Sequence, residues 1–305
     1  MKRMVVVFVL AVVCCGVLFS DMGSIPFVPR AEIYESSQQA FISWNGKTEI
    51  LVLSTDLRAS EETKVLEVIP FPAKPLVRKG SMGVFDRALQ TVNRGLKRRF
   101  GGRRQGFSLG GGGGTADNKP AGKVVSRKKI GAHDISTIQV KDGKGFVAWA
   151  MDYLKKQGAD NPVIPPPLKK VIEEYIKDGF TWFVFDIVSL GKDERTKDAM
   201  EFVFNSTSLY YPLRITRTEK GDTTVQLFVV TRKSFRKKDF IGIPFKEIHV
   251  PHKPFLIKGG TLRRIHGRSY ALLRQPVRCV LRMWEIRGKL SEFKNDLLIA
   301  GPYRK

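Results

Sequence analysis

The chain has 305 residues, of which 42% are hydrophobic and 27% charged, a composition typical of globular proteins and not of disordered ones. Its three cysteines exclude a scaffold held together by several disulfides, so the fold must rely on a buried core. The formal net charge is +24, which either attracts polyanions and anionic surfaces or only keeps the protein in solution.

The N-terminus predicts a secretory signal over residues 1–20. Lys2 and Arg3 precede sixteen uncharged residues, and Ser20 ends the run. The run is shorter than the roughly 20 apolar residues that a membrane-spanning helix needs. We therefore expect an extracytoplasmic protein that is secreted, periplasmic or bound to the cell surface. A cut after Ser20 is favoured, and an uncleaved anchor is the alternative.

Cleavage after Ser20 has two consequences for the mature chain. It removes Lys2 and Arg3, which lowers the net charge by two to +22, and it removes Cys14 and Cys15. Cys279 is then alone and no intrachain disulfide can form. Valines precede both N-terminal cysteines, so these fit a lipoprotein signal poorly.

Strands are predicted first along the mature chain. Residues 40–44 and 49–54 are rich in β-branched and aromatic side chains, and Asn45-Gly46 between them is typical of a hairpin turn. Residues 64–70 form a third strand, which ends where prolines block pairing.

A basic helix and a glycine-rich loop follow. Residues 83–100 have apolar side chains at helical spacing and Arg and Lys on the other faces. Residues 101–122 hold nine glycines and are predicted to form a flexible linker or an exposed loop. The Gly-Lys-Ser/Thr ending of a phosphate-binding loop is absent here.

The middle of the chain predicts two strands, a helical hairpin and a buried strand. The strands are residues 123–130 and 133–140, and the helices are residues 144–157 and 165–178. Residues 180–188 are almost wholly apolar, which indicates a strand buried on both faces. The aromatic side chains of these elements are expected in the core.

The rest of the chain turns to strands again. Strands are predicted at residues 199–204, 213–218 and 224–231, with residues 220–222 as the turn between the last two. In the tail we predict short strands at 239–243 and 248–250, a helix at 259–273, and a strand at 277–284 in which Cys279 faces the core.

These elements together predict an α+β fold. It would consist of an antiparallel β-rich domain with a helical hairpin, plus a basic β-rich C-terminal region. The predicted divisions are a signal peptide at 1–20, a core domain at 21–234 that includes the glycine-rich loop, and a basic extension at 235–305.

Six segments in order carry a family resemblance. They are residues 38–57, 59–75, 129–140, 146–158, 171–188 and 209–217, which read QQAFISWNGKTEILVLSTDL, ASEETKVLEVIPFPAKP, KIGAHDISTIQV, FVAWAMDYLKKQG, VIEEYIKDGFTWFVFDIV and LYYPLRITR. Over residues 21–232 the chain resembles the uncharacterised bacterial and archaeal family called domain of unknown function 2330. The resemblance implies export but no activity, so it assigns no functional residue.

The positive charge is concentrated in two regions. From Arg232 to Lys305 there are nineteen Lys and Arg against five Asp and Glu, and Arg78 to Arg104 holds nine basic residues against Asp86 alone. Because the chain is expected outside the cytoplasm, the predicted partners are membrane headgroups, cell-wall polymer or acidic polysaccharide, and nucleic acid is disfavoured. The predicted binding residues are Arg98, Arg99, Arg103, Arg104, Arg236, Lys237, Lys238, Arg263 and Arg264.

Catalytic and metal-binding patterns are weak. His249 and His252 are three residues apart, but a metal site needs a third ligand, so we predict no metal and no cofactor. His133 and Asp134 are neighbours on a strand and point to opposite faces, so they cannot act together. Cys279 is expected in the core and not as a nucleophile. The acidic pairs at 173–174 and 193–194 are expected to be structural.

Two functions remain open. The first is a non-catalytic module, associated with the cell envelope, that binds an anionic partner through its basic surface. The second is an exported hydrolase whose site is assembled from residues distant in the sequence.

Overall fold

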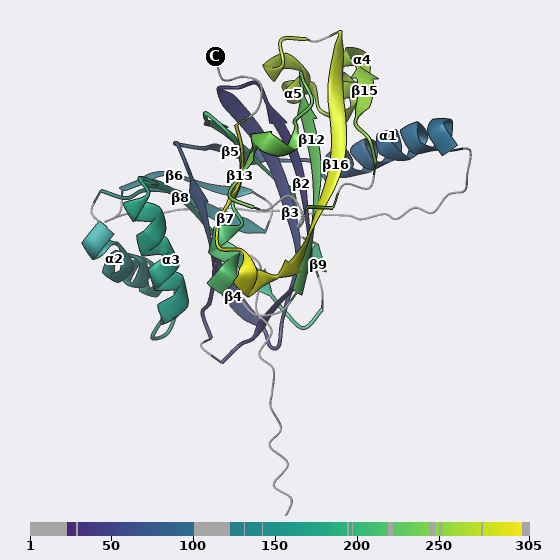
Figure 1. Ribbon diagram of the computed structural model, residues 1–305. Coiled ribbons are helices and arrows are strands. Elements are labelled where there is room, and N and C mark those ends of the chain that lie inside the picture. The colour runs from purple at the N-terminus through teal and green to yellow at the C-terminus, as the bar shows by residue number, and fades with distance from the viewer. Residues whose placement is uncertain are drawn as a thin grey trace, which may run out of the picture.

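The computed structural model describes residues 23–28, 30–100, 123–130, 132–141, 143–193, 195–196, 198–218, 222–243, 248–249, 252–275 and 277–300. The predicted signal at 1–20 and the glycine-rich loop at 101–122 lie outside these ranges. Within them the chain forms three sheets and a few helices, which confirms the α+β prediction (Figure 1).

The first sheet is antiparallel and has the strand order β1-β4-β8-β7-β6. Its strands are β1 (Gly23–Pro26), β4 (Thr63–Phe71), β6 (Lys123–Ile130), β7 (His133–Gln139) and β8 (Trp182–Leu190). One face is covered by the predicted helical hairpin, α2 (Gly143–Lys156) and α3 (Pro166–Lys177). Strand β8 is buried on both faces, as its apolar sequence predicts.

The second sheet is larger and packs on the other face of the first. Its main path is β14-β16-β12-β2-β3-β10-β5, with β15 on β16 and β9 on β3. The bounds are β2 (Ile33–Trp44), β3 (Thr48–Ala59), β5 (Leu76–Lys79), β9 (Arg195–Thr196), β10 (Met200–Asn205), β12 (Asp222–Thr231), β14 (Ile248–His249), β15 (Phe255–Lys258) and β16 (Arg278–Lys289). Strands β2 and β12 are parallel and the other pairs are antiparallel.

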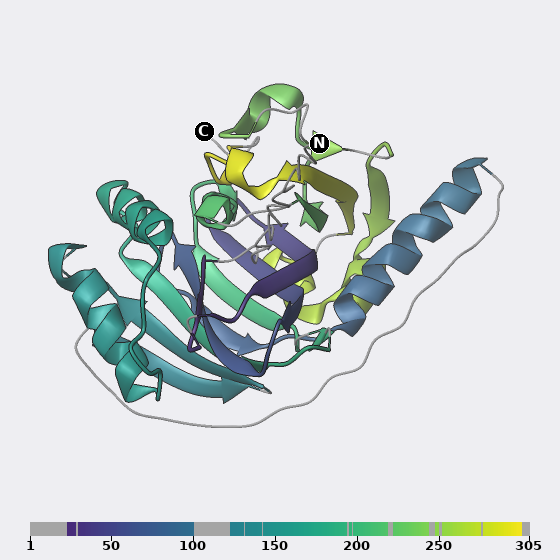
Figure 2. The ribbon, with the colours of Figure 1, turned by 90° about the horizontal axis from the view of Figure 1, so that it is seen from below.

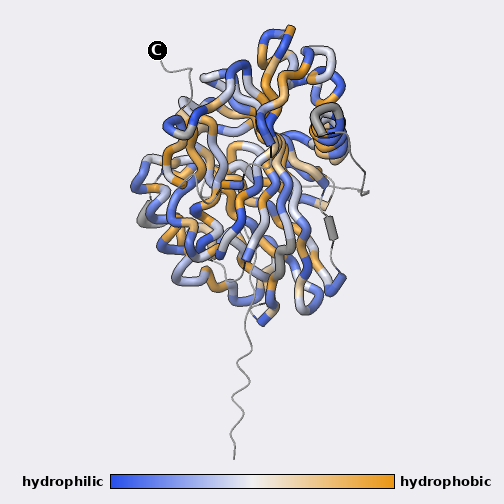
Figure 3. The backbone as a smooth tube through the Cα atoms, turned by 45° about the vertical axis from the view of Figure 1, so that its right-hand side comes forward, coloured by the Kyte–Doolittle hydropathy of each residue, from blue (hydrophilic) through white to orange (hydrophobic). Residues whose placement is uncertain are grey.

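A second group of helices covers the outer face of the large sheet. These are α1 (Gly83–Phe100), α4 (Gly259–Ile265) and α5 (Gly267–Leu272), whose apolar side chains pack against Phe41, Val52 and Phe228 of the sheet. The molecule thus has four layers, helix, sheet, sheet and helix, and Figure 2 shows α1 on the side opposite α2 and α3. Figure 3 shows hydrophobic and hydrophilic residues interleaved along the strands, as expected where one face of a strand is more buried than the other.

The hairpin between β2 and β3 forms at the predicted turn. Gly46 has a φ of 98°, which favours glycine, and the Asn45 side-chain oxygen accepts hydrogen bonds from the backbone N–H groups of Lys47 and Thr48. This turn holds the register in which Trp44 lies opposite Glu49.

One predicted strand is wrong. Residues Arg214–Thr218 form a 3-10 helix, η1, instead of a strand. The Thr216 and Thr218 hydroxyls donate to the carbonyl oxygens of Leu213 and Ile215, three residues back, and these local bonds compete with sheet pairing. The predicted hairpin between residues 213–218 and 224–231 therefore does not form, and Lys220 and Gly221 of its turn lie outside the described residues.

The C-terminal region is joined to the large sheet. Strand β16 pairs with β12 from Lys289 opposite Asp222 to Val280 opposite Thr231, so residues on both sides of Ser234 share one sheet. A third small sheet, β11-β17-β13, packs nearby and comprises β11 (Leu209–Tyr211), β13 (Phe240–Ile241) and β17 (Leu297–Ile299). The helix predicted at 259–273 is divided into α4 and α5. Two short 3-10 turns, η2 (Lys237–Asp239) and η4 (Leu290–Glu292), complete this region.

Among the helices that the structure describes, none is both long enough and apolar enough to cross a membrane.

Candidate binding site

A basic cleft of about 380 Å³ lies between α1 and the edge formed by β15 and α4. We define it by its lining residues, which are Thr91, Arg94, Gly95, Phe255, Leu256, Ile257, Lys258, Thr261 and Arg264. Its two walls come from the two basic regions of the sequence, about 160 residues apart along the chain. The fold therefore brings together positive charge that the sequence presents as two separate runs.

Close packing of α1 against β15 positions the first wall. A Cβ atom added at Gly95 would lie 2.5 Å from the ring of Phe255, so only glycine allows the helix backbone to approach this ring without a shift. Nearer the start of α1, the Arg87 Nε donates a 3.1 Å hydrogen bond to the carbonyl oxygen of Ile265 at the end of α4. A cation at this end of a helix also interacts favourably with the helix dipole.

Three exposed cations, Arg94, Lys258 and Arg264, line the cleft. None of them forms an ion pair with a carboxylate among the described residues. Arg94 donates to the Gln90 carbonyl oxygen and the Thr91 hydroxyl of its own helix, and Arg264 donates to the hydroxyl of Thr261. Such local bonds orient each guanidinium without neutralising it, so the cleft keeps a positive field.

The surrounding sequence adds positive charge and no negative charge. Residues 252–284 contain eight Lys and Arg and no Asp or Glu. Among them Arg263 is exposed on α4 next to Arg264, and Arg278 is exposed at the start of β16. This uninterrupted basic stretch is the signal in the sequence that points to Lys258, which was not among the predicted residues.

The predicted binding residues fall into three groups. Arg264 lines the cleft and Arg263 lies beside it. Arg236 and Lys238 are exposed but do not line the cleft, and Arg236 is paired with Asp239 at 3.2 Å. The side chains of Arg98, Arg99, Arg103, Arg104 and Lys237 lie outside the described part of the chain. Arg94, the third cation of the cleft, stands on the helix that carries Arg98 and Arg99.

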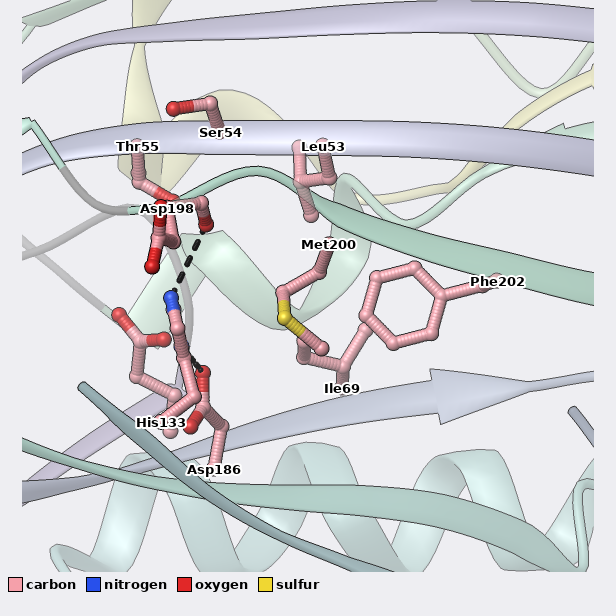
Figure 4. A pocket seen from close by; sticks show the side chains of 10 residues that line it. Leu53, Ser54, Thr55, Ile69, His133, Asp186, Asp198, Met200 and Phe202 are labelled. Atoms are coloured by element: carbon pink, nitrogen blue, oxygen red, sulfur yellow. Dashed lines mark hydrogen bonds and ion pairs between the residues drawn. The ribbon is translucent and has the colours of Figure 1, made fainter. Parts of the chain in front are cut away.

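A second polar site is buried between the two large sheets (Figure 4). His133 on β7 lies 2.5 Å from a carboxylate oxygen of Asp186 on β8, and its Nε2 lies 3.0 Å from the backbone oxygen of Asp198. Glu67 faces Asp186 across the β4–β8 pair. The cavity here is about 10 Å³, room for about one water molecule.

Hydrogen bonding fixes the protons of this buried pair. A backbone carbonyl oxygen can only accept, so the Nε2 of His133 carries a proton. The 2.5 Å distance places a hydrogen bond between Nδ1 and the Asp186 carboxyl group. Both ring nitrogens are therefore engaged, and none is left to take a proton from a substrate. His133 and Asp186 serve to join β7, β8 and the segment before β10.

A third polar cluster resembles a catalytic triad in composition. The Nε2 of His266 lies 2.9 Å from the carboxylate of Glu201, and its Nδ1 lies 2.7 Å from the hydroxyl of Ser269, which is 2.5 Å from that of Ser43. Burial by itself raises the pKa of Glu201, but hydrogen bonds and charges from His266 and Arg268 outweigh burial, so this pKa lies below its usual value. Ser43 and Ser269 are fully buried, so no substrate reaches either hydroxyl.

Asp134 and Cys279 take the orientations that strand alternation predicts. Among the described residues, no group of three His, Cys, Asp or Glu side chains could hold a metal ion, and His252 is buried with its Nδ1 near the carbonyl oxygen of Lys253. Asp134 pairs with Arg127, on the strand face opposite His133, as the alternation predicts. Cys279 is fully buried, and burial raises the pKa of its thiol to about 12.

Comparison with known proteins now identifies the family. The family model described as "uncharacterized protein conserved in bacteria (DUF2330)" matches residues 11–247. The chain belongs to the DUF2330 family. The match extends beyond the predicted coverage of 21–232 at both ends, and it includes α1 but not β15 and α4, the other wall of the basic cleft.

The remaining comparisons add no activity. Comparison with the curated proteins finds no match. Among solved structures, the crystal structure of baculovirus P35 is similar with a TM-score of 0.40 and 14% sequence identity, over 76% of each chain. A likeness at this level supports no functional argument. The DUF2330 family is described as uncharacterized, so membership in it assigns no activity to the chain.

Proposed function

We propose that this DUF2330 protein is an exported, non-catalytic module that binds an anionic partner in the cell envelope through its basic cleft. The observation that supports the proposal is the cleft itself, in which Arg94, Lys258 and Arg264 carry positive charge with no ion-paired carboxylate among the described residues. Export is supported by the sequence of residues 1–20.

The chemistry of the cleft favours phosphate or carboxylate oxygens. A guanidinium presents a planar set of N–H donors that matches such groups, and an ammonium adds a point charge. The threonine hydroxyls of the cleft, Thr91 and Thr261, can donate further hydrogen bonds. Because the cations are exposed, binding should weaken as salt screens them.

The test is to measure the affinity of the purified protein for heparin, used as a soluble acidic polymer, across a salt series. The variant R94Q/K258Q/R264Q removes the three cleft charges. The matched control K155Q/K156Q/K177Q removes three exposed charges from α2 and α3 on the opposite side of the molecule. Both variants have the same net charge, so a difference between them reports on the cleft.

We expect the cleft variant to bind heparin at least tenfold more weakly than the control in low salt. Equal affinities of the two variants would show that bulk charge, not the cleft, attracts the polymer. Absence of binding by the unmodified protein in low salt would refute the proposal itself.

The proposed location has its own test. Cell fractionation and the intact mass of the exported protein should show a chain that begins after Ser20. A full-length cytoplasmic protein would contradict export, and nucleic acid would then become the partner to test.

An exported hydrolase is the alternative function. The feature closest to it is the Ser269–His266–Glu201 cluster. The full burial of Ser269 opposes this function, and the ring uses Nδ1 for the hydroxyl where a serine hydrolase of the chymotrypsin type uses Nε2.

A further inference from the structure

The β15–β16 strand pair ends in a tip that carries both apolar and basic side chains. Lys258 lies opposite Arg278 and Leu256 lies opposite Val280. The backbone N–H of Gly259 donates to the carbonyl oxygen of Val277, which closes the end of the pair. In Figure 1 the start of β16 lies at the top of the molecule, with β15, α4 and α5 beside it. We refer to Leu256, Lys258, Arg274, Val277 and Arg278 as the β15–β16 tip.

The tip exposes large apolar side chains that the core does not use. Val277 is 86% exposed and Leu256 is 62% exposed, the two highest values among the large hydrophobic side chains of the described residues. They lie three positions apart along the strand pair, about 10 Å at the rise of a β-strand, so strand alternation places them on opposite faces of the pair, where they flank its end. Single exposed apolar residues are ordinary, but two at one projecting end, with cations around them, form a surface that a partner can cover.

The charge around these side chains has one sign. Lys258, Arg274 and Arg278 are exposed within the tip, and Arg263 and Arg264 stand on α4 next to it. The tip is continuous with the basic cleft, because Leu256 and Lys258 belong to both. A partner that covers the tip must therefore offer apolar groups to Leu256 and Val277 and anionic groups to the cations around them.

We infer that the β15–β16 tip inserts into the surface of an anionic phospholipid bilayer. Such a surface is the partner that presents phosphate groups and acyl chains within a few ångströms of each other. Lys and Arg then lie among the headgroups while Leu256 and Val277 reach the boundary of the acyl chains. A soluble polysaccharide or teichoic polymer offers the anions but little apolar material, so it would leave the apolar side chains in water. This inference rests on the proposed function and names the partner for it.

The experiment separates the apolar contribution from the charge. The purified protein is sedimented with vesicles of phosphatidylcholine alone and of phosphatidylcholine with 30% phosphatidylglycerol. The variant L256S/V277S removes the apolar side chains of the tip and keeps every charge. The control L76S/V163S removes two other exposed apolar side chains, on β5 and in the loop before α3. Heparin binding of each protein is measured in parallel.

We expect binding to the anionic vesicles and not to phosphatidylcholine alone. The tip variant should bind at least tenfold more weakly than the control, since full burial of one such side chain is by itself worth about tenfold or more. The control L76S/V163S and the single variant V277S, which leave the lining of the cleft unchanged, should retain heparin affinity within about twofold. Removal of one tip charge, as in R278Q, should weaken vesicle binding about fivefold.

The outcomes separate the two proposals. If the protein binds heparin and no vesicles, the lipid inference is wrong and the proposed function stands. If L256S/V277S binds anionic vesicles as the control does, the tip does not insert. If neither probe is bound in low salt, both proposals are refuted.

Discussion

A buried carboxyl group at the C-terminal end of the chain should make stability depend on pH in an unusual direction. Asp296 is 6% exposed and accepts a 2.6 Å hydrogen bond from the Tyr175 hydroxyl of α3 and a 2.9 Å bond from the backbone N–H of Arg214. Burial raises the pKa of Asp296 from 3.8 to about 6, although these bonds and the charge of Arg214 oppose the shift. Between about pH 4 and pH 6, therefore, Asp296 keeps a proton in the folded protein that it releases in the unfolded chain.

The sign and magnitude follow from this difference. A group with a raised pKa contributes stability below its unfolded pKa, near pH 4, and loses it as the pH rises through its folded pKa, near 6. A shift of about two units corresponds to about 3 kcal/mol. In the variant Asp296→Asn the side chain cannot titrate, while its oxygen can still accept both hydrogen bonds. Its free energy of unfolding, relative to the unmodified protein, should increase by about 2–3 kcal/mol between pH 4 and pH 7, because part of the effect already lies below pH 4.

Urea unfolding at intervals of one pH unit, followed by tryptophan fluorescence, measures this difference. The variant Asp160→Asn makes the same chemical change on an exposed loop and serves as the control. The prediction concerns the change with pH and not the offset between the proteins, because the substitution also alters packing. A difference that stays constant from pH 4 to pH 7, or that moves in favour of the unmodified protein as the pH rises, would refute the reasoning.

Two further predictions test the packing at the basic cleft and in the core. Gly95→Ala should lower the free energy of unfolding by about 1 kcal/mol, because overpacking against Phe255 exceeds the gain in helix propensity. The control Gly260→Ala in α4, where the added Cβ meets nothing within 4 Å, should cause no loss. Urea unfolding of both variants measures the difference, and a Gly95→Ala variant more stable than the unmodified protein would contradict the close approach of α1 to Phe255. In a C14S/C15S variant, Cys279 is the only thiol. It should react with a thiol reagent only after unfolding, because burial raises the pKa of its thiol to about 12. Rapid labelling of the native protein would contradict the burial of Cys279.

Local patterns in the sequence were sufficient for most of the secondary structure. Helix α1 has the predicted bounds, and the turn at Asn45-Gly46 and the doubly buried β8 form as expected, because each depends on side chains close in sequence. The exception at Arg214–Thr218 depends partly on a distant group, since the Asp296 carboxylate accepts from the backbone of Arg214. No sequence window contains that partner.

Buried polar side chains were harder to predict than apolar ones. Glu49 and Glu201 are fully buried on strands, and Asp186 is nearly so within an apolar run. Burial raises the pKa of Glu49 well above its usual value, and a bond from the backbone N–H of Tyr210 offsets this only in part. Their partners, such as His266 for Glu201, come from distant segments, so strand alternation predicts which face they occupy but not what they contact there.

The basic cleft, too, depends on contacts between segments that are distant in the sequence. Composition predicts basic regions around residues 78–104 and after residue 232, but it does not indicate that they meet in one cleft. Their meeting depends on the contact between Gly95 and Phe255. Judged by helix propensity alone, Gly95 is a weak position in α1. In the folded protein, however, Gly95 lets β15 approach α1 closely. This approach brings Arg94 into one cleft with Lys258 and Arg264.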